Sequence, residues 1–345
     1  MAFLFSFIFV KILKMYFSLI IPVYNRPDEI DELLQSLSQT SYREPFEIVI
    51  IEDGSTMRCD HLIEQYREQL QISYFYKPNS GPGDSRNFGM QKANGDYFII
   101  FDSDCIIPSQ YLSEVASALE HEPVACFGGP DKALDSFSDI QKAINFAMTS
   151  FLTTGGIRGG SERINKFQPR SFNMGISKKA FEKSGGFGDI HPGEDPDLSI
   201  RLWNMGFETR LFPSAFVYHK RRIDWTKFLI QVNKFGKARP ILNHWHPKYN
   251  KPTYFFPTVF LIGFLTALFL MLFQSFLLIG LYGLYFILLF LESAYKNKSL
   301  KIASYSVWAA CLQFYGYGTG FLKSFFLVEI LKRDPKKAMP ELFFK

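Results

Sequence analysis

The chain has 345 residues, of which 47% are hydrophobic and 17% aromatic, and its formal net charge at pH 7 is +5. That length allows a full α/β domain and an additional region, and so small a basic excess does not indicate a nucleic-acid-binding protein. The four cysteines have no CxxC or other ligand-like spacing, so they support neither a zinc site nor a disulfide framework.

The chain begins with a short apolar run. Residues 1–10 are apolar, but Lys11 and Lys14 follow, so the run is shorter than the roughly 20 residues that a membrane span requires. It also lacks a small-residue cleavage site. We interpret residues 1–15 as an apolar N-terminal extension, either an interfacial helix or an over-long start, and we do not expect export of the domain that follows.

From residue 17 onward, strand and helix signals alternate, which is typical of a largely parallel sheet with helices on its faces. The first predicted strands are 17–23, 47–51, 72–76 and 97–101, and the helices between them are 27–39, 61–70 and 85–93. Ligands of open α/β sheets bind beyond the carboxyl ends of the strands. Polar residues that follow three of these strands are therefore candidate site residues.

The strand at 97–101 is followed by two carboxylates, Asp102 and Asp104. Side chains two positions apart at an extended strand end share one face, so both could offer oxygens to one Mg²⁺ or Mn²⁺. A solvated turn is the alternative, because Asp is common in turns. The neighbouring motifs favour the metal site.

Five motifs occur in one order: IPVYN at 21–25, EDGS at 52–55, GDSRNFG at 83–89, DSD at 102–104 and GEDPDLSIR at 193–201. In this order they resemble the family 2 glycosyltransferases of the GT-A fold. The likeness covers about residues 17–245. It implies an α/β fold of GT-A type, with a Rossmann-like nucleotide-binding domain and a largely parallel central sheet, which we place at residues 16–250.

The resemblance implies where the sugar donor binds. Pro22, Tyr24 and Asn25 would border the nucleotide, and Arg86 would lie beside the donor. Asp53 would accept a hydrogen bond from the base, as the matching aspartate does from uracil, so a UDP-sugar is the favoured donor.

The same resemblance implies a metal site. Asp102 and Asp104 would hold a divalent cation, Mn²⁺ or Mg²⁺, against the donor diphosphate, and His219 would be a third ligand. Lys220 would meet the phosphates or form part of a solvated basic face. A lone histidine is more often structural, and that interpretation stays open.

Asp195 precedes Pro196, which suits the first turn of a helix running to about residue 205. The resemblance matches Asp195 to the catalytic base that takes a proton from the acceptor hydroxyl. The alternative is an ordinary first-turn acid at a helix N-terminus. Glu194 and Asn173 are implied to lie on the acceptor side, although Asn173 also suits a turn.

Residues 252–291 contain no charged side chain, which predicts a membrane hairpin at about 254–291. Lysines on both sides of the hairpin place its ends, and the catalytic domain, on the cytoplasmic side of the cell membrane. A third apolar segment, at about 302–331, is interrupted by glycines and Lys323, and we expect a re-entrant or interfacial helix. Together these form a membrane region at 251–331, followed by a basic C-terminal tail at 332–345.

We therefore expect a metal-dependent, inverting, non-processive glycosyltransferase that moves a sugar from a nucleotide-diphosphate sugar to a hydroxyl of a saccharide or lipid-linked acceptor at the membrane. One alternative is a processive polysaccharide synthase, disfavoured because residues 231–239 lack the Gln-x-x-Arg-Trp motif and the spans are few. The other is a catalytically inactive nucleotide-sugar-binding protein. It is disfavoured because Asp53, Asp102, Asp104 and Asp195 are all present.

Overall fold

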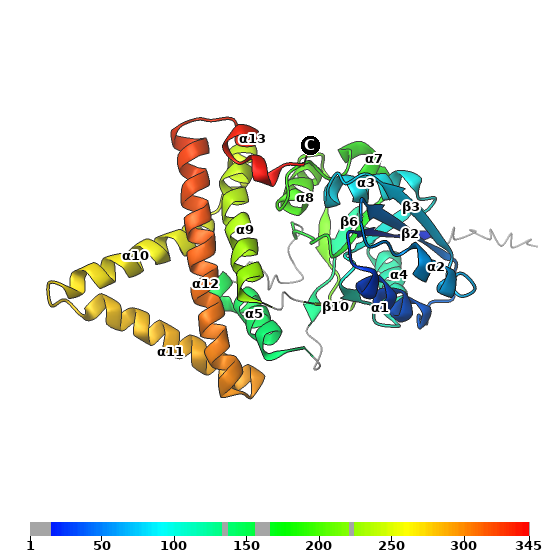
Figure 1. The fold of residues 1–345 in the computed structure, drawn as a ribbon. Helices are drawn as coiled ribbons and strands as arrows, with labels where there is room; N and C mark the ends of the chain where they lie inside the picture. The colour runs from blue at the N-terminus through cyan, green and yellow to red at the C-terminus, as the bar shows by residue number, and fades with distance from the viewer. Residues whose placement is uncertain (1–14, 133–136, 156–165, 221–223, 345) are drawn as a thin grey trace, which may run out of the picture.

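A computed structural model of the chain describes residues 15–132, 137–155, 166–220 and 224–344 (Figure 1). The predicted N-terminal extension, except residue 15, lies outside these residues. An α/β domain forms one side of the molecule, and long helices form the other.

The central sheet has seven strands in the order β3-β2-β1-β4-β8-β6-β9. The strands β1 to β4 pair in parallel, β8 is antiparallel to β4 and β6, and β9 is parallel to β6. Their bounds are β1 Phe17–Val23, β2 Phe46–Asp53, β3 Ile72–Lys77, β4 Tyr97–Phe101, β6 Cys126–Gly128, β8 Asn173–Ser177 and β9 Thr209–Leu211. The expected largely parallel sheet is confirmed.

Helices cover both faces of this sheet, which explains why its inner strands are apolar almost throughout. Leu19 and Ile21 of β1 pack on one face and Ile20 on the other. The first face is covered by α1 (Pro27–Ser38), α2 (Asp60–Tyr66) and α4 (Tyr111–His121). The second is covered by α3 (Pro82–Lys92), α7 (Lys178–Ser184) and α8 (Glu194–Asn204).

A small second sheet lies beyond the end of β4. It consists of β5 (Cys105–Ile106), β10 (Val217–His219) and β7 (Asp131–Lys132), in the order β5-β10-β7. The antiparallel pairing of β10 with β5 places His219 opposite Cys105. A histidine more than one hundred residues along the chain is thereby brought next to the DSD motif.

Residues 231–239 lie within a long helix, α9 (Trp225–Trp245), which packs along α12 (Leu300–Phe325) (Figure 1). Small residues permit this close contact. A Cβ added to Gly320 would lie 2.3 Å from the carbonyl oxygen of Asn233, and one added to Gly236 would lie 2.2 Å from that of Tyr317. The glycines that we interpreted as interruptions of the third apolar segment are in fact helix contacts, and α12 is continuous. Whether α12 crosses a membrane stays open.

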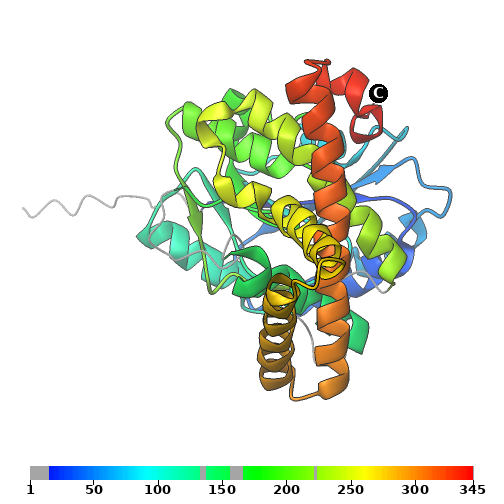
Figure 2. The same ribbon diagram turned by 90° about the vertical axis from the view of Figure 1, so that its left-hand side faces the viewer.

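The predicted hairpin is formed by α10 (Phe256–Met271) and α11 (Leu277–Asn297). It projects away from the α/β domain in Figure 1 and toward the viewer in Figure 2. Among the described residues, Pro252–Met271 and Leu277–Asn297 are long and apolar enough to cross a membrane, and few of their residues are buried. The short helices α5 (Asp139–Thr149) and α6 (Phe151–Thr154) lie near the base of the hairpin, and α5 packs on α12.

The segment predicted as a basic tail is packed against the α/β domain. After a π-helical turn (η3, Phe326–Ile330), it forms α13 (Pro335–Ala338) and a 3₁₀ turn (η4, Pro340–Leu342). Met339 and Leu342 are fully buried with Ile190 and Ala238. Charge counts alone gave no sign of this contact, because it depends on a few apolar residues between the lysines.

The α9–α12 contact predicts a stability effect. Gly236→Leu places a side chain against the backbone of α12, and overpacking of this kind costs about 1–3 kcal/mol. We expect a lower melting temperature of the detergent-solubilised chain, measured by tryptophan fluorescence. Gly280→Leu on α11 is the matched control, since nothing lies within 4 Å of a Cβ there. Equal melting temperatures for the two variants would contradict the close packing.

Candidate active site

The two carboxylates after β4 lie in a turn. The strand ends at Phe101, and the amide of Cys105 donates to the carbonyl of Asp102 at 3.2 Å. The extended strand end that we predicted is therefore wrong, because the chain reverses before it enters β5. Asp102 contacts Arg86, whereas Asp104 contacts His219.

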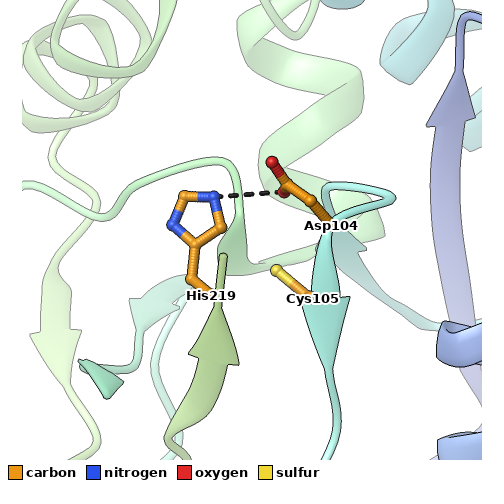
Figure 3. Close-up of side chains that lie close together, drawn as sticks. All are labelled: Asp104, Cys105 and His219. Atoms are coloured by element: carbon orange, nitrogen blue, oxygen red, sulfur yellow. Dashed lines mark ion pairs between the residues drawn. The ribbon is translucent and has the colours of Figure 1, made fainter. Parts of the chain in front are cut away.

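Asp104, Cys105 and His219 point toward one another (Figure 3), and one potential ligand atom from each lies within 4.8 Å of the others. His219 Nε2 is 3.1 Å from Asp104 Oδ1, and the His219 ring stacks on Phe172 with centroids 4.5 Å apart. A guanidinium nitrogen of Arg26 lies 3.6 Å from the other oxygen of Asp104. This cluster is assembled by the β5–β10 pairing.

The donor atoms of this cluster fit a divalent cation. Carboxylate oxygen and imidazole nitrogen suit Mn²⁺, and Asp104 and His219 offer one of each at close range. The thiol of Cys105 donates to the carbonyl of Phe172 at 3.4 Å, and burial raises its pKa well above the usual value, so it is protonated. We therefore regard Asp104 and His219, without Cys105, as the residues of this cluster that fit a divalent cation. Asp102 lies beside them, with its carboxylate directed to Arg86.

Asp53 and Asn25 organise the loops at the ends of β1 and β2. The carboxylate of Asp53 accepts from Lys77 Nζ at 2.6 Å and from the amides of Ser80 and Gly81, each at 3.0 Å. Asn25, at φ +54°, accepts from the amide of Met57 through its side chain at 2.9 Å. These contacts hold the loop that enters α3. The predicted contact of Asp53 with the nucleotide base stays a prediction.

The other two residues predicted to border the nucleotide lie at the same edge. Pro22 is half-buried near the end of β1, and Tyr24 follows it with 53% of its surface exposed. An exposed aromatic ring at a strand end is available to a ligand. That Pro22 and Tyr24 border the nucleotide stays a prediction.

The buried Arg86 joins two parts of the site. One guanidinium nitrogen is 2.7 Å from Asp102 and another is 3.2 Å from Glu194. Arg86 lies on α3, where Gly89 allows close packing because a Cβ there would meet Ile51 at 2.4 Å. The residue predicted to lie beside the donor therefore links the turn after β4 to the start of α8.

Glu194 and Asp195 begin α8, yet their pKa values shift in opposite directions. Burial alone would raise the pKa of Glu194, but His191 at 2.8 Å and Arg86 outweigh it and hold that pKa well below the usual value. Burial, together with the charge of Glu194, raises the pKa of Asp195 to about 6. Asp195 accepts from the amide of Ser171 at 3.1 Å through Oδ2, and Oδ1 has no partner among the described residues. A carboxylate with these properties suits a general base.

Asn173 and Lys220 are engaged elsewhere. Asn173 is fully buried, accepts from the Tyr111 hydroxyl at 2.5 Å and donates to the carbonyl of Ala215 at 2.8 Å. These are the contacts of a structural residue, and its predicted place on the acceptor side stays a prediction. The side chain of Lys220 pairs with Glu32. Arg221 and Arg222, the other cations of that basic run, lie outside the described residues.

Sequence reasoning missed the C-terminal contribution to the site. The amide of His191 donates to the carbonyl of Leu342 at 2.7 Å, and the Phe344 ring lies 5.9 Å from the His191 ring. Phe344 also packs on Gly81, where a Cβ would lie 2.3 Å from it. One segment thus contacts the loop before Glu194 and the loop before α3. The available signal was the group of apolar residues in this tail, among them the Phe pair at 343–344.

A family model described as glycosyl transferase family 2 matches residues 18–185. That match includes the DSD motif and ends before Asp195 and His219. The probable glycosyltransferase YdaM of Bacillus subtilis is 26% identical over 276 residues, which are 72% of this chain and 63% of YdaM. The poly(ribitol-phosphate) beta-N-acetylglucosaminyltransferase TarS of Staphylococcus aureus is 34% identical over 109 residues, 31% of this chain and 19% of TarS. The chain thus spans less than two thirds of the length of these relatives.

The mannosyltransferase PcManGT from Pyrobaculum calidifontis, solved in complex with GDP-Man and Mn²⁺, shares the fold. It superposes with a TM-score of 0.61 at 15% sequence identity, covering 87% of this chain and 86% of its own. The likeness includes the helical region as well as the α/β domain, because it extends over so much of both chains. The α/β fold of GT-A type expected from the motifs is confirmed.

The double contact of Arg86 predicts a large stability effect. Arg86→Gln leaves the buried Glu194 without its guanidinium partner, and removal of one member of a buried ion pair costs about 3–5 kcal/mol. We expect a marked fall in melting temperature. Arg58→Gln is the control, because Arg58 is exposed and its ion pair is with the exposed Asp60. If both variants melt like the wild type, Arg86 does not join the two parts of the site.

Proposed function

The chain belongs to glycosyltransferase family 2, and from this we propose that it transfers a sugar from a nucleotide-diphosphate sugar to an acceptor hydroxyl, with Asp195 as the general base. The observation that carries the proposal is the pairing of an ionised Glu194 with an Asp195 of raised pKa at the start of α8. Environments that push the pKa values of neighbouring carboxyl groups apart are typical of acid–base sites.

The proposed reaction inverts the anomeric centre. The acceptor oxygen forms a bond to the anomeric carbon as the bond from that carbon to the diphosphate oxygen breaks, and the diphosphate leaves with the electron pair. Asp195 Oδ1 takes the hydroxyl proton, while the amide of Ser171 holds Oδ2 in place. Glu194 stays ionised beside Arg86, so the proton goes to Asp195 and not to its neighbour.

Asp104 and His219 would hold the divalent cation, with Asp102 beside them. Such a cation supplies positive charge that stabilises a departing diphosphate. Arg26 lies 3.6 Å from Asp104 and can contribute further positive charge at this edge of the sheet. The Mn²⁺ in the structure of the mannosyltransferase with the same fold supports a metal here.

The choice of nucleotide base depends in this proposal on Asp53. We favour a UDP-sugar, because an aspartate at this position can accept a hydrogen bond from uracil. The mannosyltransferase with the same fold was solved with GDP-Man, so GDP-sugars are the alternative donors to test. Thermal-shift screening of UDP- and GDP-sugars with Mn²⁺ identifies base and sugar together.

We further propose that the acceptor is a membrane or lipid-linked saccharide and that the α/β domain faces the cytoplasm. The exposed apolar hairpin of α10 and α11 supports membrane attachment. Its basic flanks, such as Lys251 before it and Lys296 after it, support the orientation, since positive residues collect on the cytoplasmic side.

The metal assignment predicts a binding defect. Asp104→Asn replaces a carboxylate with an amide, a poorer ligand for a hard cation, so we expect Mn²⁺ affinity to fall about tenfold or more. Titration of Mn²⁺ followed by electron paramagnetic resonance measures this without turnover. Asp139→Asn, at the distant start of α5, should bind Mn²⁺ as the wild type does. Unchanged Mn²⁺ affinity in Asp104→Asn would refute the site.

The base assignment predicts the pH profile. An aspartate must be ionised to accept a proton, so kcat should rise with pH through an apparent pKa of about 6 and level off above it. Asp195→Asn should lower kcat by about 10²–10⁴-fold and leave donor affinity nearly unchanged. Rates measured from pH 5 to 8 with saturating donor check both points. A profile without the acid limb, or an active Asn variant, would remove Asp195 from the chemistry.

A further inference from the structure

Two arginines near Asp195 differ from the other arginines that the structure describes. Each of the others that is at least partly buried has a carboxylate within ion-pair distance; these are Arg26, Arg86, Arg201 and Arg210. Arg170 and Arg239 are also partly buried, but neither has an ion pair or side-chain hydrogen bond to a carboxylate in the described part of the chain. Two partly desolvated cations that have no carboxylate in direct contact indicate a place where a further anion can bind.

Both arginines lie close to the candidate base. Arg170 directly precedes Ser171, whose amide donates to Asp195 at 3.1 Å. Arg239 follows Ala238 on α9, and a Cβ added to Gly193, just before Glu194, would lie 3.5 Å from the Ala238 side chain. The charges of Arg239 and Asp195 both act on Arg170. Burial lowers the pKa of Arg170, and the positive charge of Arg239 lowers it further.

The arginines also lie at the entrance to the apolar hairpin. The guanidinium of Arg239 lies over the ring of Tyr254, 4.0 Å from its centroid. Tyr254 belongs to a 3₁₀ turn (η2, Pro252–Phe255) that leads directly into α10. The cationic pair therefore stands between the base and the exposed apolar surface of the hairpin, where the head of a lipid-linked molecule would lie.

We propose that Arg170 and Arg239 bind a phosphate group that links the acceptor sugar to a lipid carrier, with the acceptor hydroxyl at Asp195. This deepens the proposed function and rests on it. Guanidinium groups bind phosphate oxygens through paired hydrogen bonds, which suits a phosphate held by two arginines. The donor diphosphate is the other possible occupant. It is disfavoured because its charge would be met by the cation that Asp104 and His219 are proposed to hold, whereas Arg239 comes from α9, which lies on the helical side of the molecule.

The test is calorimetric titration of the full chain in detergent, without sugar donor. The probes are citronellyl phosphate, citronellol, inorganic phosphate, and UDP and GDP with Mn²⁺. The variants are Arg170→Gln and Arg239→Gln, with Arg239→Lys to keep the charge. Lys234→Gln is the matched control, because it removes one positive charge from the same helix. Retained nucleotide binding and melting temperature show that each variant is folded.

We expect the wild type to bind citronellyl phosphate more tightly than citronellol or inorganic phosphate. Each Gln variant should bind it about tenfold to a hundredfold more weakly, with Arg239→Lys between and Lys234→Gln unchanged. Equal binding by Gln variants and wild type overturns the site. If the Gln variants lose nucleotide binding but keep citronellyl phosphate binding, the arginines bind the donor, and the proposed acceptor site is overturned. Inorganic phosphate binding as tightly as citronellyl phosphate overturns the lipid carrier. Failure of the proposed function would appear separately, as a chain that binds citronellyl phosphate but no nucleotide.

Discussion

The ion pairs of Arg86 with Asp102 and Glu194 are the constraint on which the site depends. They connect three elements that the chain contributes far apart: α3, the turn after β4 and the start of α8. α3 itself is placed by Asp53, which accepts hydrogen bonds from the two amides just before the helix. His191 and Arg86 together keep Glu194 ionised, and the charge of Glu194 helps burial to raise the pKa of Asp195, although Arg86 itself acts to lower it. One buried guanidinium thus holds the three elements together and, with His191, maintains the charge of Glu194.

The helical region contacts the loop that precedes Glu194. α12 packs closely on α9 through glycines, and α9 places Ala238 against the loop that precedes Glu194. Beyond α12, the chain turns back through η3, and Leu342 accepts a hydrogen bond from His191 in the same loop. The loop before the base is therefore held between α9 and the C-terminal segment. A displacement of the helices relative to the α/β domain would therefore also displace the start of α8, where Glu194 and Asp195 lie.

Local patterns predicted the strands and the hairpin well, because continuous apolar runs report directly on burial. β1 begins and ends where it was predicted, and α10 and α11 form the expected helical hairpin. Contacts between distant residues were beyond local patterns. Arg86 and Glu194 are 108 positions apart, so no local pattern could indicate their contact. The chain turns at Asp102, where an extended strand end was expected, and helix α4 was not predicted. His219 was found only through the family resemblance, since a single histidine carries no periodic signal.

The electrostatics of Asp195 connect the two proposals. A position in the first turn of a helix stabilises a carboxylate, and Arg86 and Arg170 lower its pKa as well, yet burial and Glu194 outweigh all three. A phosphate bound at Arg170 and Arg239 would neutralise part of the positive charge that now stabilises the ionised form of Asp195. The pKa of Asp195 would then rise further when the acceptor is bound. An acceptor that carries a phosphate would in this way strengthen the base at the moment when its hydroxyl is in place.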